Sequence, residues 1–130
     1  MNNKETKDQD NVVNLFPSQD KLKLEIGRTL SREFLLRNMH PVHPASVLAI
    51  FFRFLPMNGI KFIGSDNQVC QHEQIRNLER CISMKLLRLY TTFTQTPSPG
   101  DITTDIFNEL KKHNIRVMAP KQFKVVCTLH

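Results

Sequence analysis

The chain has 130 residues, of which 40% are hydrophobic and 23% are charged, and it carries a net charge of +6. This length and composition are typical of one globular domain. The longest apolar run, from Ala45 to Leu55, contains Arg53 and is shorter than the roughly 20 residues of a membrane-spanning helix. The three cysteines are widely spaced and no apolar leader follows the initiator Met, so we expect a reducing, cytoplasmic compartment and no membrane association.

Residues 1–14 are predicted to form a disordered polar tail, followed by a single globular domain over residues 15–130. The tail contains no aromatic residue, so it has little apolar surface to bury. It holds two lysines and three acidic residues, which leaves 16 basic and 9 acidic side chains, a net charge of +7, in the domain. Val13, Leu15 and Phe16 at the junction allow two interpretations. They pin the tail to the domain's own core, or they form a short motif that orders in a partner's groove.

The first two helices are predicted from the spacing of apolar residues. A helix over residues 20–38 is indicated by leucine, isoleucine and phenylalanine at intervals of four, ended by Pro41 and Pro44. The stripe comprises Leu22, Ile26, Leu30 and Phe34, with Leu24, Leu36 and Met39 widening it. A second helix over residues 44–55 is apolar on all sides and is therefore predicted to be the centre of the core.

Two further helices are predicted after a turn at residues 56–59 and a short strand over residues 60–63. The third helix is expected over residues 66–93, with Ser65 as its cap and Gln68 completing a capping box. Its apolar residues step by three and four, which is a heptad seam shorter than the three to four full heptads of a coiled coil. These apolar residues are Ile75, Leu78, Ile82, Leu86, Leu89 and Phe93. The fourth helix is expected over residues 101–113, capped by Asp101 and ended by Asn114.

The C-terminus has the alternating pattern of a hairpin, with strands over residues 115–119 and 123–129 joined by a turn at Pro120. The predicted fold class is therefore α+β, mostly α. It consists of about four helices, a buried central helix and a C-terminal β-hairpin.

No catalytic, cofactor-binding or metal-binding site is predicted. His40 and His43 are three residues apart, but no third metal ligand follows at a recognisable spacing. On the third helix Cys70 and His72 would lie about 200° apart around the axis, so they do not form a nucleophile and base. Asp101, Asp105 and Glu109 repeat every four residues, as expected for a solvated helix face. We therefore expect no enzyme and no cofactor.

Basic residues on the first and third helices provide a candidate nucleic-acid-binding face. Arginines four residues apart are placed to contact phosphates, although interspersed glutamates fit a mixed solvated surface equally. The candidate residues are Arg28, Arg32, Arg76, Arg80, Lys85 and Arg88.

The pattern of residues does not indicate a specific activity, and it allows two classes of function. The first is a small non-enzymatic regulatory adaptor or inhibitor that contacts an unidentified protein partner. Its expected partner-binding residues are Val13, Leu15 and Phe16 at the junction of tail and domain, and Leu87 and Tyr90 on the third helix, whose spare surface also allows a homodimer. The alternative is a basic regulator associated with nucleic acid through the arginine and lysine faces of the first and third helices.

Overall fold

The computed structural model describes residues 19–37 and 42–120. The predicted tail over residues 1–14, with the motif at Val13, Leu15 and Phe16, lies outside the described residues. So do Met39, His40 and the expected strand over residues 123–129. The elements are α2 (Gln19–Leu36), α3 (Pro44–Ala49), η1 (Ile50–Phe54), η2 (Pro56–Asn58), β1 (Lys61–Ile63), α4 (His72–Tyr90), α5 (Pro99–Lys112) and β2 (Arg116–Met118).

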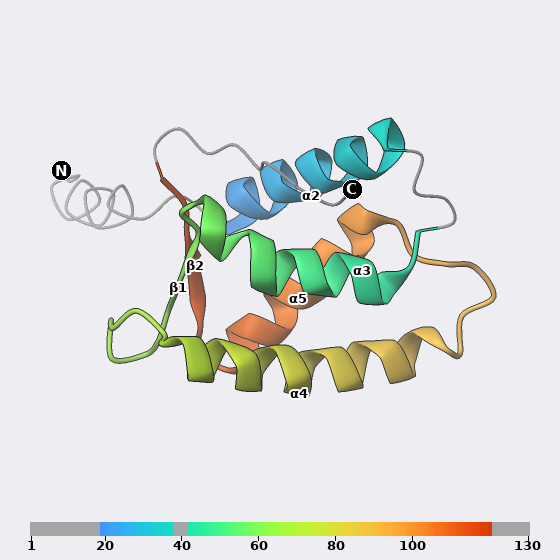
Figure 1. Ribbon diagram of the computed structural model, residues 1–130. Helices are drawn as coiled ribbons and strands as arrows, with labels where there is room; N and C mark the ends of the chain where they lie inside the picture. Colours follow the sequence, from blue (N-terminus) through green and yellow to red (C-terminus); the bar gives the residue numbers. More distant parts are fainter. Residues whose placement is uncertain (1–18, 38–41, 121–130) are drawn as a thin grey trace, which may run out of the picture.

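The described elements confirm the predicted α+β, mostly α class. Helices α2 and α4 run along opposite sides of the molecule, and α3 and α5 lie between them (Figure 1). α2 packs most extensively against α5, whereas α3 packs against both α4 and α5. The two strands lie side by side at one end of the helices (Figure 1). Each outer helix therefore has one face against the centre and one toward solvent.

The predicted buried central helix is present as α3 and the π-helix η1, which follows it without a break. Its wide turn is closed by the amide of Leu55, which donates to the carbonyl of Ile50 at 3.1 Å. A π turn lowers the rotation per residue, so neighbouring side chains face the same side. Phe51 and Phe52 are both buried, and the Phe51 ring centroid lies 5.3 Å from that of Phe52, 6.0 Å from Phe62 and 5.7 Å from Phe107.

The third helix begins later than predicted, at His72. The segment before it folds into a tight turn in which Asn67 has a φ of 62° and the Gly64 amide donates to the Gln68 carbonyl at 2.9 Å. The Asp66 side chain accepts from the Gln68 amide at 3.0 Å. Aspartate and asparagine bind nearby backbone in this way and so compete with helix formation. The predicted cap at Ser65 is therefore wrong.

Capping residues set the start of both α4 and α5. Gln71 caps α4, and its amide donates to Gln74 Oε1 at 2.6 Å. Ser98 caps α5, since its Oγ accepts from the Asp101 amide at 3.1 Å while its own amide donates to the Asp101 carboxylate at 3.4 Å. Asp101 thus completes the capping box and is not the cap that was predicted. The predicted stop is confirmed, since Asn114 has a φ of 59° just beyond α5.

β2 pairs with β1 in an antiparallel sheet, with Phe62 opposite Val117. The Gln19 side chain extends this pairing into the first turn of α2. Its Nε2 donates to the Val117 carbonyl at 2.8 Å, and its Oε1 accepts from the Val117 amide at 3.0 Å. The start of α2 is therefore fixed to β2 by two hydrogen bonds that resemble those of a third strand.

A close crossing of α2 and α5 at Gly27 fixes the separation of these helices. A Cβ atom on Gly27 would lie 3.3 Å from the Gly100 Cα and 3.9 Å from the Thr103 Cβ. The first contact is with backbone, which has little freedom to move. Thr103 is fully buried there, and its hydroxyl donates to the Pro99 carbonyl at 2.8 Å. The two backbones meet directly because Gly27 has no side chain.

We expect Gly27→Val to lower the free energy of unfolding by about 1–3 kcal/mol, because three added carbons overfill the crossing. Gly100→Ala is the control, since a Cβ there meets only the Ser98 Oγ, at 3.8 Å. Urea denaturation of both variants measures the effect. An unfolding midpoint of Gly27→Val equal to that of the original protein would contradict the close crossing.

Candidate protein-binding surface

α2 has a solvent-exposed stripe of three cations and two leucines opposite the face that it buries. We call this stripe the α2 outer face; its residues are Lys21, Leu24, Arg28, Arg32 and Leu35, and all are exposed. Leu24 is 55% exposed and Leu35 64% exposed. The buried face consists of the predicted core stripe Leu22, Ile26, Leu30 and Phe34. The two faces of α2 therefore differ, since one is buried and the other is exposed to solvent.

The predicted inward position of Leu24 and Leu36 is wrong. At about 100° per residue, Leu24 lies about 160° around the axis from Ile26, which is nearly the opposite side of the helix. Leu36, which is 71% exposed, lies at the same angle of about 160° around the axis from the buried Phe34. The stripe of α2 that packs in the core is formed by Leu22, Ile26, Leu30 and Phe34, and Leu24 and Leu36 lie outside it.

The cations of the α2 outer face form no salt bridge within the part of the chain that the structure describes. Arg28 and Arg32 form no salt bridge with another described residue, although Glu25 is on the same helix. The flanking cations differ, since Lys23 lies 3.6 Å from the carboxylate of Asp20 and Arg37 pairs with Glu33 at 3.3 Å. The free positive charge of α2 is therefore concentrated on its outer face.

A shallow groove of about 400 Å³ runs beside Leu24, between α2 and the start of α5. The small residues of the α2–α5 crossing form its floor and walls. It is lined by Lys23, Leu24, Gly27, Arg28, Ser31, Gly100, Asp101 and Thr104. The α2 outer face is therefore bordered by a depression of the size of a few side chains.

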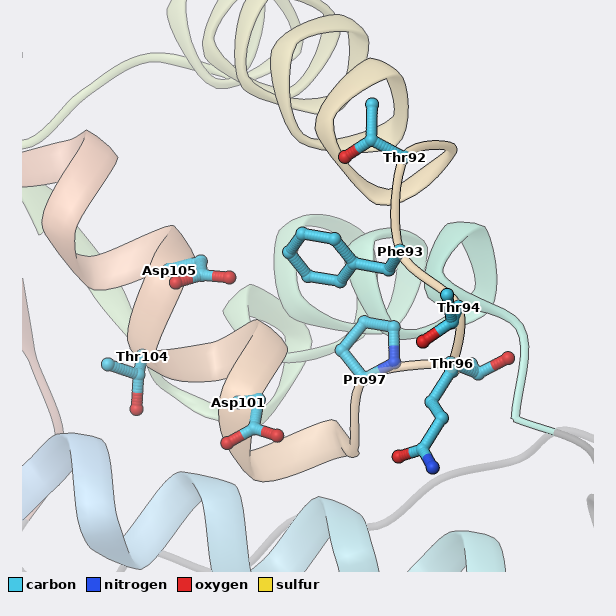
Figure 2. A pocket seen from close by; sticks show the side chains of 9 residues that line it. Thr92, Phe93, Thr94, Thr96, Pro97, Asp101, Thr104 and Asp105 are labelled. Carbon is cyan, nitrogen blue, oxygen red and sulfur yellow. The ribbon is translucent and has the colours of Figure 1, made fainter.

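A second groove, of about 710 Å³, lies between the α4–α5 loop and α5 and meets the first at Asp101 and Thr104. Figure 2 shows Phe93 and Pro97 on the loop side, opposite Asp105 on α5. Phe93 is 47% exposed and packs on the ring of Tyr90, with centroids 5.5 Å apart. The surface bordering α5 thus combines apolar rings with carboxylates.

Leu87 and Tyr90, predicted to contact a partner, are directed into the fold. Tyr90 is buried, and its hydroxyl donates to Asp105 Oδ2 at 2.7 Å. Burial and the hydrogen bond to Asp105 raise the pKa of Tyr90 well above its ordinary value. Leu87 packs half-buried against the core. The exposed apolar side chains at this end are instead Leu89 and Phe93, which belong to the predicted seam.

Four of the six residues of the predicted α4 seam pack in the protein's own core. Ile82 and Leu86 are buried, and Ile75 and Leu78 pack against them. The remaining surface of α4 is rich in exposed cations, which are Arg76, Arg80, Lys85 and Arg88. Lys85 lies 3.0 Å from Glu109, and Arg76 donates to His72 at 3.2 Å.

The arginines of α2 and α4 do not form one continuous face. α3 and α5 separate the two helices, which lie on opposite sides of the molecule (Figure 1). Arg28 and Arg32 therefore lie on one side and Arg76 and Arg80 on the other. Sequence spacing placed each pair on its helix surface correctly, but it carries no information on the direction in which each helix faces.

Among residues 19–37 and 42–120, the reactive side chains Cys70, Cys81 and His113 line one pocket of about 380 Å³. Within these ranges no three His, Cys, Asp or Glu side chains are placed to hold a metal ion. Cys70 precedes α4 and does not lie on it, contrary to the prediction, and both Cys70 and Cys81 are free thiols. Burial, with a smaller effect of Asp66, raises the pKa of Cys70 above its ordinary value. This shift disfavours the nucleophilic thiolate.

No helix in the described part of the chain is long and apolar enough to cross a membrane. Comparison with protein families, with curated proteins and with solved structures found no match to this chain. The candidate surface therefore rests on the geometry of this protein alone.

Glu109 departs from the solvated acidic stripe predicted for α5. It is 6% exposed, and its carboxylate lies 3.0 Å from the Lys85 amine and 3.1 Å from the Lys112 amine. Burial by itself raises the pKa of Glu109. The hydrogen bonds from the two lysines outweigh burial, so the pKa lies below its ordinary value of 4.5. The ion pair with Lys85 joins α4 to α5.

We expect Glu109→Gln to lower the free energy of unfolding by about 1 kcal/mol at pH 7. A carboxyl whose pKa is lowered by folding stabilises the protein above its unfolded-state pKa, and this stabilisation is lost as the pH falls through the folded-state pKa. The difference between the variant and the original protein should therefore disappear in acid. Urea denaturation from pH 7 to pH 3 measures it. A difference that stays constant over this range, or that equals the effect of the exposed control Glu73→Gln, would contradict the proposed linkage.

Proposed function

We propose that this protein is a small non-enzymatic regulator, an adaptor or inhibitor, that acts by binding another protein through the α2 outer face. One observation carries the proposal. Leu24 and Leu35 are each more than half exposed on one stripe, among cations that have no partner in the described structure. Single exposed leucines are ordinary on protein surfaces, but apolar residues within a charged rim are typical of contact surfaces.

The relief of the surface supports the same proposal. Interfaces gain most of their binding energy from a few side chains that fill pockets on the partner. The groove beside Leu24 offers such a pocket, and Gly27 and Gly100 keep it free of large side chains. A single helix face is smaller than a standard interface, so we expect a transient complex. The free thiols Cys70 and Cys81 suit the reducing cytoplasm that we propose as its compartment.

Association with nucleic acid is the second candidate, because Arg28 with Arg32 and Arg76 with Arg80 are exposed pairs four residues apart. Phosphates would satisfy these guanidinium groups but would leave Leu24 and Leu35 in water. The separation of the two pairs by α3 and α5 also limits a straight duplex to one pair at a time (Figure 1). Protein binding accounts for both the leucines and the arginines, so we place it first.

Quantitative affinity capture from the source cells, with the full chain as bait, tests the proposal. We expect a protein that is retained by the original chain and lost with Leu24→Ser or Leu35→Ser, because each change removes an exposed apolar anchor. Met84→Ser is the matched control. Met84 is 61% exposed, on α4 at the opposite side of the molecule.

Two results would contradict the proposal. One is that no captured protein distinguishes the α2 variants from the original chain. The other is retention of nucleic acid in place of protein, with the steep salt dependence that phosphate contacts produce. The second result would assign the α2 arginines to phosphate binding.

A further inference from the structure

We infer that the α2 outer face receives an acidic amphipathic helix of the partner protein. The inference rests on the proposed function and adds the chemistry and shape of the partner. Its basis is the combination of helical spacing, unpaired positive charge and an adjoining groove on one surface.

The spacing of the exposed residues matches that of a helix–helix seam. Lys21, Leu24, Arg28, Arg32 and Leu35 are separated by 3, 4, 4 and 3 residues. Side chains at these intervals form the ridge that a second helix contacts along its length. The stripe is about 21 Å long at 1.5 Å per residue, which corresponds to a partner helix of about four turns.

Charge complementarity determines the polar part of the partner. Lys21, Arg28 and Arg32 outweigh Glu25, so the exposed stripe and its flank are positive. Because Arg28 and Arg32 have no salt bridge with another described residue, an acidic partner breaks no existing pair. Guanidinium groups bind carboxylates in a two-pronged geometry. We therefore place glutamate or aspartate on the partner helix opposite each arginine.

Leu24 and Leu35, near the two ends of the stripe, determine the apolar part. Each meets an apolar side chain of the partner, and the partner residue opposite Leu24 enters the groove between Gly27 and Thr104. Asp101 on the far wall is the one acidic residue that lines this groove. It lies in the first turn of α5, where the helix dipole offsets part of its charge.

A membrane surface fits this stripe less well than a helix does. Helices that bind bilayers have a continuous apolar face with cations at its borders. Here Arg28 lies in the middle of the stripe, between Leu24 and Leu35, so insertion of both leucines would also draw Arg28 toward the acyl chains. Nucleic acid, in turn, makes no use of the leucines. An acidic helix is the partner that pairs with every exposed residue of the stripe.

A fluorescently labelled, amidated peptide of about 14 residues, with leucines near both ends of its contact stripe and glutamates at the central positions opposite Arg28 and Arg32, tests the inference by anisotropy. We expect it to bind the full chain, and to bind about tenfold or more weakly to Arg28→Glu/Arg32→Glu and to Leu24→Ser/Leu35→Ser. Arg76→Glu/Arg80→Glu on α4 makes the same charge change on the opposite side and should leave the affinity unchanged. Circular dichroism of each variant checks that its helices are retained.

Three results would overturn the inference. The first is equal affinity for a peptide of the same composition in scrambled order, which would leave only non-specific charge attraction. The second is an equal loss with the α4 variant. The third is tighter binding, at the same salt concentration, to duplex DNA or to phosphatidylglycerol vesicles. If the peptide fails while the capture experiment still shows a protein lost with Leu24→Ser, the proposed function stands and only the acidic helix is rejected.

Discussion

Burial of the central helix determines the position of every other described element. Phe51 lies within ring-contact distance of Phe52, Phe62 and Phe107, so η1, β1 and α5 meet at one aromatic cluster. Residues of α2 and α4 cover this cluster from opposite sides. Each covering helix buries only one face against the core. The apolar residues of α2 are therefore buried on that face and exposed on the other.

The exposed surfaces of α2 and α4 differ in composition as a result. On α4 most of the apolar seam packs in the core, and the outer surface is rich in arginine and lysine. On α2 the outer surface keeps Leu24 and Leu35 together with Arg28 and Arg32. The close crossing at Gly27 adds a groove along this side. The proposed function therefore rests on the α2 residues that are not buried in the core. The two basic helices, α2 and α4, are not equivalent, because only α2 combines exposed arginines with a groove and two exposed leucines on one stripe.

Local rules predicted much of this fold, and the errors have identifiable causes. The fourfold spacing of Leu22, Ile26, Leu30 and Phe34 correctly gave the buried face of α2, and the all-apolar segment correctly gave the centre of the core. The start of α4 was misplaced because a turn at Asp66 and Asn67 competed with a capping signal. The strand β1 was predicted, but its pairing with β2 joins segments that are distant in sequence and has no local signature. The candidate surface was missed because Leu24 was assigned to the core before the buried face of α2 was known.

The central claim is that α2 has one face buried in the core and one face exposed to solvent. Residue-resolved carbene footprinting of the full chain, followed by mass spectrometry, tests it most directly, because labelling reports the solvent exposure of individual leucines. We expect strong labelling of Leu24 and Leu35 and protection of Leu22 and Leu30 on the same helix. Equal labelling of all four, or protection of Leu24 and Leu35 in the isolated monomer, would contradict the account.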